Sequence, residues 1–274
     1  MVNKKIQSIM DQSFGKLEAE WNLSPWPPIK VSPPVVSDTL IGHLQSGRVR
    51  SVSGIKRIIG PRRVELNDGE QIDVDAMICC TGYRNDFSII DRRYDPSIDP
   101  PAAWSQAPGS KDRPLPRLYQ NVFSLEKPDS LAFVGCVWFA SGSFCIADIA
   151  SMCIAQVWVG KSTLPGPEEM SRWTDRQTDR MVGLAHRGTP VVASVPQADW
   201  LRWADETAGA GLYERMGWGR KGWWFWWTDR ELYGIVMDGV LTSASWRLFD
   251  EGKRKPWPEA RGEIVRLNRE AQEG

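Results

Sequence analysis

The pattern of apolar and polar positions divides the chain into three parts. Residues 1–46 carry apolar side chains at helical spacing, residues 47–165 contain short strand-like runs, and residues 166–274 return to a helical period. We expect one part of the fold for each of these ranges. The predicted helices cover residues 6–21, 38–45 (with Ser37 as the cap), 145–159, 168–185, 198–208, 229–237 and 258–270.

The strand-like runs are of two kinds. Short runs separated by turn residues predict strands over residues 48–52, 55–59, 63–66 and 71–74. A tight turn is expected at Asn67-Asp68-Gly69. Residues 76–80 and 131–137 are apolar without alternation, which is typical of strands buried on both faces of a parallel sheet. Residues 86–117 are polar and rich in proline, and we expect a long surface loop there.

Two turns lie next to elements that are expected to be buried. Thr81-Gly82-Tyr83 ends the run over residues 76–80, and ligands of open α/β sheets bind beyond the carboxyl ends of strands. Ser141-Gly142-Ser143 precedes the apolar helix, whose first turn has free N–H groups and a positive dipole end. Such a turn suits a phosphate or an electron-rich ring oxygen. The alternatives are a plain turn after a core strand and a serine that caps a core helix.

Composition excludes several classes of function. Lys+Arg and Asp+Glu both number 34, so no basic field favours nucleic acid. The densest basic stretch is expected to be the wet face of a small sheet and comprises Arg48, Arg50, Lys56, Arg57, Arg62 and Arg63. With 2 histidines and no ligand spacing, a zinc site or a Ser/His/Asp triad is not expected.

Three features of the sequence concern the cellular compartment and possible contact with a membrane. All 5 cysteines lie in apolar runs, which predicts buried thiols in a reducing compartment. No apolar signal core follows the N-terminus, and we expect a cytoplasmic protein without membrane association. The cluster Trp223-Trp224-Phe225-Trp226-Trp227 is interpreted as a core anchor. A membrane-interface or partner surface, flanked by Arg220, Lys221 and Arg230, is the alternative.

Four phrases occur in an order that resembles a known family. They are Asp75 to Tyr83, Leu118 to Phe123 with Leu131 to Gly135, Gly160 to Pro165 with Glu168 to Met170, and Leu232 to Leu248 with Lys255 to Ala260. Together they resemble the C-terminal portion of the flavin-containing monooxygenases of the dimethylaniline monooxygenase type. Cys80 stands where that family usually has alanine, and Ala150 where it often has glutamine.

The resemblance implies an α/β fold, the C-terminal part of a two-dinucleotide Rossmann-type fold with a strand cluster and a helical C-terminal region. Residues 1–46 would then lead in from the NADP-type domain, residues 47–165 would return to the FAD-binding domain, and residues 166–274 would form the helical region. FAD and NADP are the implied cofactors. O2 and a small organic amine, sulfide or ketone are the implied reactants, and Baeyer–Villiger chemistry stays open beside N- or S-oxidation.

The implied site lies around the flavin. It comprises Thr81, Gly82 and Tyr83 near FAD, Gly135, and Ser141, Gly142, Ser143 and Phe144 near the isoalloxazine edge. No catalytic residue and no metal ligand are assigned. We expect both glycine-rich pyrophosphate loops to be absent from these residues. The alternative is therefore a catalytically incomplete fragment, or a subunit that associates with a chain carrying the N-terminal half.

Overall fold

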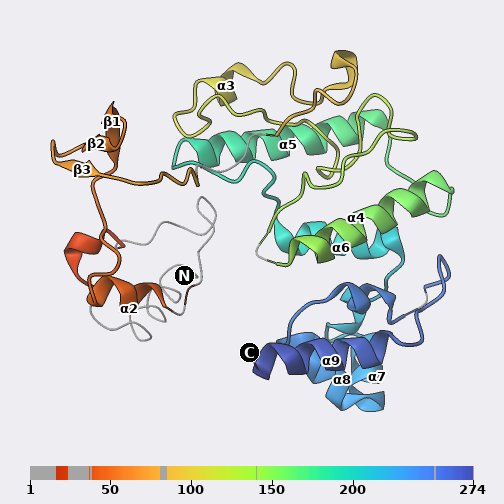
Figure 1. Ribbon diagram of the computed structural model, residues 1–274. Helices are drawn as coiled ribbons and strands as arrows, with labels where there is room; N and C mark the ends of the chain where they lie inside the picture. The colour runs from red at the N-terminus through yellow and green to blue at the C-terminus, as the bar shows by residue number, and fades with distance from the viewer. Residues whose placement is uncertain are drawn as a thin grey trace. The chain divides into compact units, whose positions relative to one another are not determined.

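The computed structural model describes residues 17–23, 37, 39–80, 85–139, 141–249 and 251–273. It divides into two compact units, Met1–Arg84 and Asn85–Gly274, each of which is described by itself (Figure 1). The described elements of the first unit are η1 (Ala19–Trp21), α2 (Leu40–Gln45), β1 (Ile55–Gly60), β2 (Arg63–Leu66) and β3 (Gln71–Asp73). Most of the helix predicted over residues 6–21 lies outside the described residues.

The described strands of the first unit form an antiparallel sheet in the order β1-β2-β3. Val64 faces Ile58 on one side and Ile72 on the other. The predicted Asn-Asp-Gly turn joins β2 to β3, with Gly69 at φ +88°, a conformation that glycine adopts without steric cost. Three of the four predicted short strands are thus confirmed, whereas residues 48–52 form no strand. Ser37 accepts a hydrogen bond from the Leu40 N–H at 3.2 Å, in keeping with its predicted role at the start of α2.

The prediction for the basic stretch is confirmed for Lys56, Arg57 and Arg63, which are exposed on the strands, whereas Arg48 and Arg50 precede the sheet. Glu65 accepts from Lys56 at 2.8 Å and from Arg57 at 2.6 Å, and Arg63 donates to Asp73 at 2.7 Å. More than half of each of these three basic side chains is exposed. Because solvent screens such pairs, they contribute little to the free energy of unfolding.

The buried strand predicted over residues 76–80 is wrong for the described chain. These residues form no strand, Ile78 is 86% exposed, and Cys79 and Cys80 are exposed as well. An apolar strand is stable only where neighbouring strands satisfy its backbone and helices cover both faces. Within the described residues no strand pairs with this run.

The second unit is helical and has its core around α4 (Ser143–Trp158). Helix α4 lies against α6 (Gln197–Ala208), and Figure 1 shows the two side by side. The other described elements are η2 (Arg92–Tyr94), α3 (Ala102–Ser105), α5 (Pro167–Ala185), η3 (Tyr213–Arg215), α7 (Arg220–Thr228), α8 (Arg230–Asp238), η4 (Ser243–Arg247) and α9 (Ala260–Glu273). The predicted helices of this half are confirmed, and α7 is added to them.

Buried indoles connect segments that are far apart in the sequence. Trp200 of α6 donates from Nε1 to the Gln120 carbonyl at 2.8 Å, and Trp104 donates to the Arg113 carbonyl at 2.9 Å. Each of these two tryptophans is 1% exposed. Each therefore contributes a large apolar surface to the core and keeps its polar N–H satisfied there.

Two further expectations are corrected in this unit. Residues 86–117 are no plain surface loop, because they include η2 and α3, and Trp104 packs beside Met181 and Leu184 of α5. Residues 131–137 form no strand beyond an isolated bridge between Phe123 and Ala132. Of this run only Cys136 and Val137 are buried. A short apolar run does not by itself predict a strand, since the partner needed for pairing lies elsewhere in the chain. Among the described residues, no helix is both long and apolar enough to cross a membrane.

The thiols allow a first test of this fold. Burial raises the pKa of Cys136 and Cys145 to about 11, and Cys153 is fully buried. At pH 8 an aromatic disulfide reagent should therefore react rapidly with Cys79 and Cys80 alone, and with all 5 cysteines after denaturation. The Cys79→Ser/Cys80→Ser variant should lose the rapid phase. A rapid phase that persists in this variant would contradict the fold described.

Candidate functional site

The candidate site begins at the first turn of α4, where Ser143 and Phe144 are exposed and the buried face of the helix starts at Cys145. Gly142 is the N-cap residue, and no side chain makes a capping hydrogen bond there. Ser143 and Phe144 are exposed, Phe144 to 87%, whereas Cys145 and Ile146 are 4% exposed. The serine cap that the sequence left open as an alternative is therefore not formed.

This turn has the properties of a binding surface for electron-rich atoms. Within the described part of the chain, the N–H groups of Ser143, Phe144 and Cys145 have no acceptor, and the positive end of the helix dipole lies among them. Among the described residues, nothing lies within 4 Å of the position that a Cβ would take at Gly142 or at Gly135. A flat ligand can therefore approach the backbone closely at both glycines.

The segment before α4 is held firmly. Trp138 forms a parallel bridge with Ser194, and Phe139 packs on Trp200 with ring centroids 5.7 Å apart. The buried amide of Asn121 donates to the Cys136 carbonyl at 2.9 Å. These contacts fix the direction in which the chain enters α4, and a fixed backbone is what a binding turn requires.

Helix α4 is also held from its other side by η4. Trp246 donates from Nε1 to the Cys145 carbonyl at 3.0 Å. The guanidinium of Arg247 makes two hydrogen bonds with the carboxylate of Asp148, the one from Nη2 to Oδ1 at 2.7 Å. The hydrogen bond with Asp148 raises the pKa of Arg247, so the guanidinium stays charged at any physiological pH. The contacts of η4 with Cys145 and Asp148 therefore hold α4 directly after its exposed first residues.

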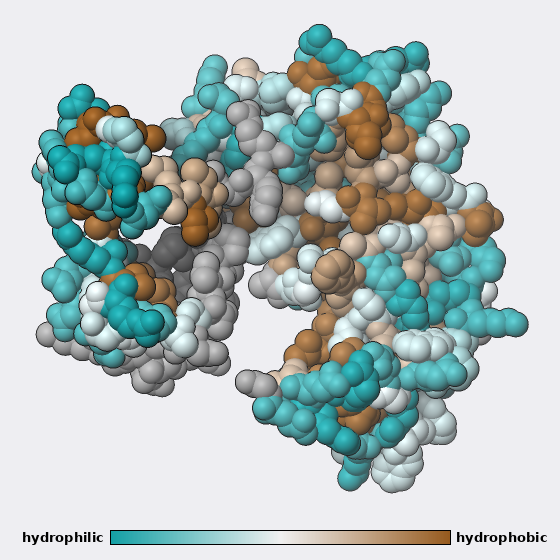
Figure 2. All heavy atoms as spheres, in the orientation of Figure 1, coloured by the Kyte–Doolittle hydropathy of each residue, from teal (hydrophilic) through white to brown (hydrophobic). Residues whose placement is uncertain are grey.

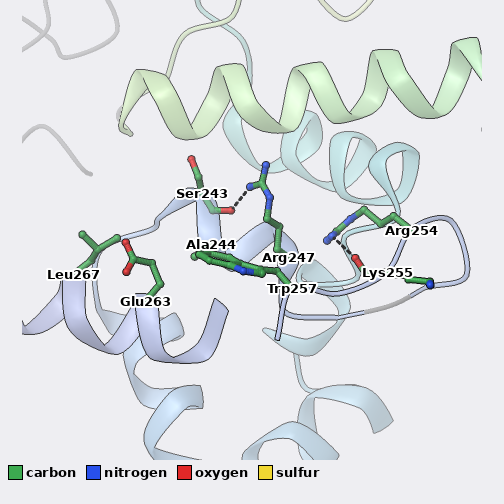
Figure 3. A pocket seen from close by; sticks show the side chains of 8 residues that line it. All are labelled: Ser243, Ala244, Arg247, Arg254, Lys255, Trp257, Glu263 and Leu267. Atoms are coloured by element: carbon green, nitrogen blue, oxygen red, sulfur yellow. Dashed lines mark hydrogen bonds between the residues drawn. The ribbon is translucent and has the colours of Figure 1, made fainter. Parts of the chain in front are cut away.

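An open pocket of about 640 Å³ adjoins this attachment (Figure 3). It is lined by Ser243, Ala244, Arg247, Arg254, Lys255, Trp257, Glu263 and Leu267. Three of these side chains are cationic, and the one carboxylate, Glu263, forms an ion pair with Arg266 at 2.7 Å. In Figure 3 the Trp257 indole lies beside Ala244, below Arg247.

The structure places only some of the predicted site residues. Gly135, Ser141, Gly142, Ser143 and Phe144 lie in the second unit, around the entrance to α4. Thr81, Gly82 and Tyr83 lie outside the described residues. That the two groups meet at one flavin remains a prediction. Trp246 and Arg247 were missed, because only the fold brings η4 to α4 across about a hundred residues; the separation is 99 for Arg247 and Asp148.

One glycine-rich match was also overlooked. Gly217, Gly219 and Gly222 have the spacing G-x-G-x-x-G and open α7. The element before them is the 3-10 turn η3, whereas a dinucleotide fingerprint requires a strand there. A Cβ at Gly222 would lie 1.8 Å from the Gly217 carbonyl oxygen, so this glycine serves close packing within its own loop. The match is therefore not a pyrophosphate loop.

Comparison with known proteins gives the family. Residues 1–271 match the family described as flavin-binding monooxygenase-like. Monooxygenase aurF of Gibberella zeae is 39% identical over 275 residues, which cover 100% of this chain and 52% of that protein. Flavin-containing monooxygenase FMO GS-OX-like 2 of Arabidopsis thaliana is 26% identical over 142 residues, which cover 51% of this chain and 28% of that protein. The solved structure of S-allyl-L-cysteine S-oxygenase from Allium sativum matches 79% of this chain and 42% of its own at 22% identity, with a TM-score of 0.47.

The chain belongs to the flavin-binding monooxygenase-like family, because the match runs over nearly its whole length. The resemblance inferred from the ordered phrases is thereby confirmed, and the family implies an enzyme with a flavin cofactor. The chain spans about half the length of the first of these relatives, 52%.

The attachment of η4 to α4 can be tested by a double-mutant cycle. Asp148→Asn, Arg247→Gln and the double variant should reveal a coupling free energy on the order of 1 kcal/mol, because two charge-assisted hydrogen bonds are partly shielded from solvent. The Glu263–Arg266 pair on α9 is the control, because Arg266 is 53% exposed against 32% for Arg247. Equal coupling in the two cycles, measured by urea unfolding, would contradict a special role for Arg247.

Proposed function

We propose that this chain is the flavin-facing part of a flavin-dependent, NADPH-using monooxygenase. The reaction would insert one oxygen atom of O2 into a small organic amine, sulfide or ketone. The observation that carries the proposal is the uncapped, exposed first turn of α4 in a chain of this family. It fits a flavin because free N–H groups and an unobstructed Gly142 suit the electron-rich oxygens of a flat ring.

In this proposal the flavin supplies the redox chemistry when it is bound. The N–H groups of Ser143 and Phe144 orient the ring, and the phenyl ring of Phe144 excludes water from its edge. Trp246 and Arg247 keep α4 in place while the ligand binds. Thr81, Gly82 and Tyr83 would contact FAD from the other stretch of chain.

The finer fold assignment belongs to the same proposal. Residues 1–46 would lead in from the NADP-type domain, residues 47–165 would complete the FAD-binding domain, and residues 166–274 would form the helical region.

A second candidate is a subunit that needs another polypeptide for its dinucleotide sites. Two observations favour it: the only G-x-G-x-x-G of the sequence is not of the dinucleotide-binding kind, and Met77 and Ile78 are exposed, the latter to 86%. A tagged chain purified from its native source should then bring with it both bound FAD and a second polypeptide with strand-flanked glycine-rich loops. A flavin-loaded monomer would favour the first candidate.

The flavin contact can be tested by a substitution that moves stability and binding in opposite directions. Gly142→Asp places a carboxylate at the N-cap, which should stabilise α4 by about 1 kcal/mol. The same carboxylate should weaken FAD binding at least about tenfold, because it occupies the N–H groups and repels electron-rich oxygens. Thermal unfolding and FAD fluorescence titration, on the chain or on its native complex, measure the two effects.

Gly166→Asp is the matched control, since Gly166 is the uncapped N-cap residue of α5 and also has negative φ, −64°. It should raise stability by a similar amount and leave FAD binding unchanged. Unaltered FAD affinity in Gly142→Asp would place the flavin elsewhere.

A further inference from the structure

Four exposed tryptophans gather at α7, where the sequence favoured a core anchor. Trp218, Trp223, Trp224 and Trp227 are 86%, 52%, 69% and 72% exposed. Together with Arg220 they are called here the tryptophan surface. The core-anchor interpretation is therefore wrong for most of the cluster, since only Phe225, 5% exposed, is buried. Large exposed aromatic groups of this kind mark interaction surfaces.

The tryptophan surface is one face of a helix that is fixed by its opposite face. Positions 220, 223, 224 and 227 fall within about 100° of arc at 3.6 residues per turn. On the opposite side the Phe225 ring packs edge-on against Tyr233 and Phe249, with centroids 5.5 and 5.2 Å apart. The tryptophans consequently project from a rigid support.

The charged side chains of the tryptophan surface itself are basic. Arg220 lies within it, and no acidic residue occurs between Trp218 and Thr228. The guanidinium of Arg230 stacks 4.0 Å from the centroid of the Trp226 ring.

Four acidic groups on neighbouring elements have basic partners of their own. Glu214 and Glu251 pair with Lys221, and Glu251 pairs with Arg215 as well. Asp229 and Glu231 both pair with Arg261, at 2.7 and 3.0 Å. None of these carboxylates therefore opposes the approach of an anionic surface to Arg220.

We propose that the tryptophan surface docks on the interface of a lipid bilayer that contains anionic headgroups. Tryptophan is the side chain enriched at headgroup level, because its ring is amphipathic and its N–H stays hydrated. In Figure 2, pale residues of intermediate hydropathy lie among teal ones at the lower right edge, where Figure 1 labels α7. A folded domain with such a surface lies on a membrane and does not span it. Arg220 adds attraction to the anionic headgroups.

This inference reverses the expectation of no membrane association, and it is independent of the flavin proposal. On α7 every exposed apolar side chain is a tryptophan.

Sedimentation with vesicles tests the inference on the full chain. The unaltered chain should bind vesicles of phosphatidylcholine with phosphatidylglycerol. Trp224→Ser/Trp227→Ser should reduce the partition coefficient by more than about tenfold, since two aromatic rings leave the interface. Arg220→Gln should weaken binding only when phosphatidylglycerol is present. Trp257→Ser, which removes a tryptophan that is 40% exposed outside this surface, is the matched control and should bind normally.

Other outcomes would overturn the inference. The first is that the unaltered chain does not bind vesicles with or without phosphatidylglycerol. The second is that Trp257→Ser loses as much binding as Trp224→Ser/Trp227→Ser. The third is a lipid-free dimer, seen in light scattering, that Trp224→Ser/Trp227→Ser abolishes. Circular dichroism of each variant ensures that a loss of binding is not a loss of fold. Because the substituted side chains are exposed, the thermal midpoint should stay close to that of the unaltered chain.

Discussion

The burial of α4 is the constraint on which the second unit depends. Its apolar residues Cys145, Ile146, Ile149, Ala150, Cys153 and Ile154 are buried, whereas Ser151, Ala155 and Trp158 are exposed. Helix α6 and η4 cover the buried part, and the segment from Tyr119 to Phe139 contributes further buried rings. This cover leaves Gly142, Ser143 and Phe144 of the first turn exposed. The candidate site is this uncovered first turn.

Three polar side chains inside this cover have well-defined partners. The indole N–H of Trp200 and that of Trp246 each find a backbone carbonyl, and Arg247 finds the carboxylate of Asp148. An unmatched group at any of these places would cost on the order of 1–3 kcal/mol. These bonds therefore specify the arrangement of helices around α4 as well as stabilising it, and the exposed turn takes its fixed position from them.

The tryptophans of this chain serve two different purposes. Trp104, Trp200 and Trp246 are buried and connect distant segments, whereas Trp224 and Trp227 of α7 face outward beside Arg220. The sequence alone does not separate the two groups, because burial depends on which face of a helix meets the core. The outward group gives the molecule a surface suited to lipid, some distance along the chain from the turn proposed to face the flavin.

By itself the sequence determined the family, through four ordered phrases. It also determined most of the helices, the Asn-Asp-Gly hairpin and the exposure of the basic residues on the strands. These are local properties, set by side-chain period and turn chemistry. The tertiary structure alone decided that residues 76–80 are exposed and unpaired, that Trp246 and Arg247 hold α4, and that the tryptophans of α7 point outward. It also decided that the G-x-G-x-x-G spacing at Gly217 belongs to a packing turn. Each of these depends on which distant segment lies beside the residue, and no local pattern contains that information.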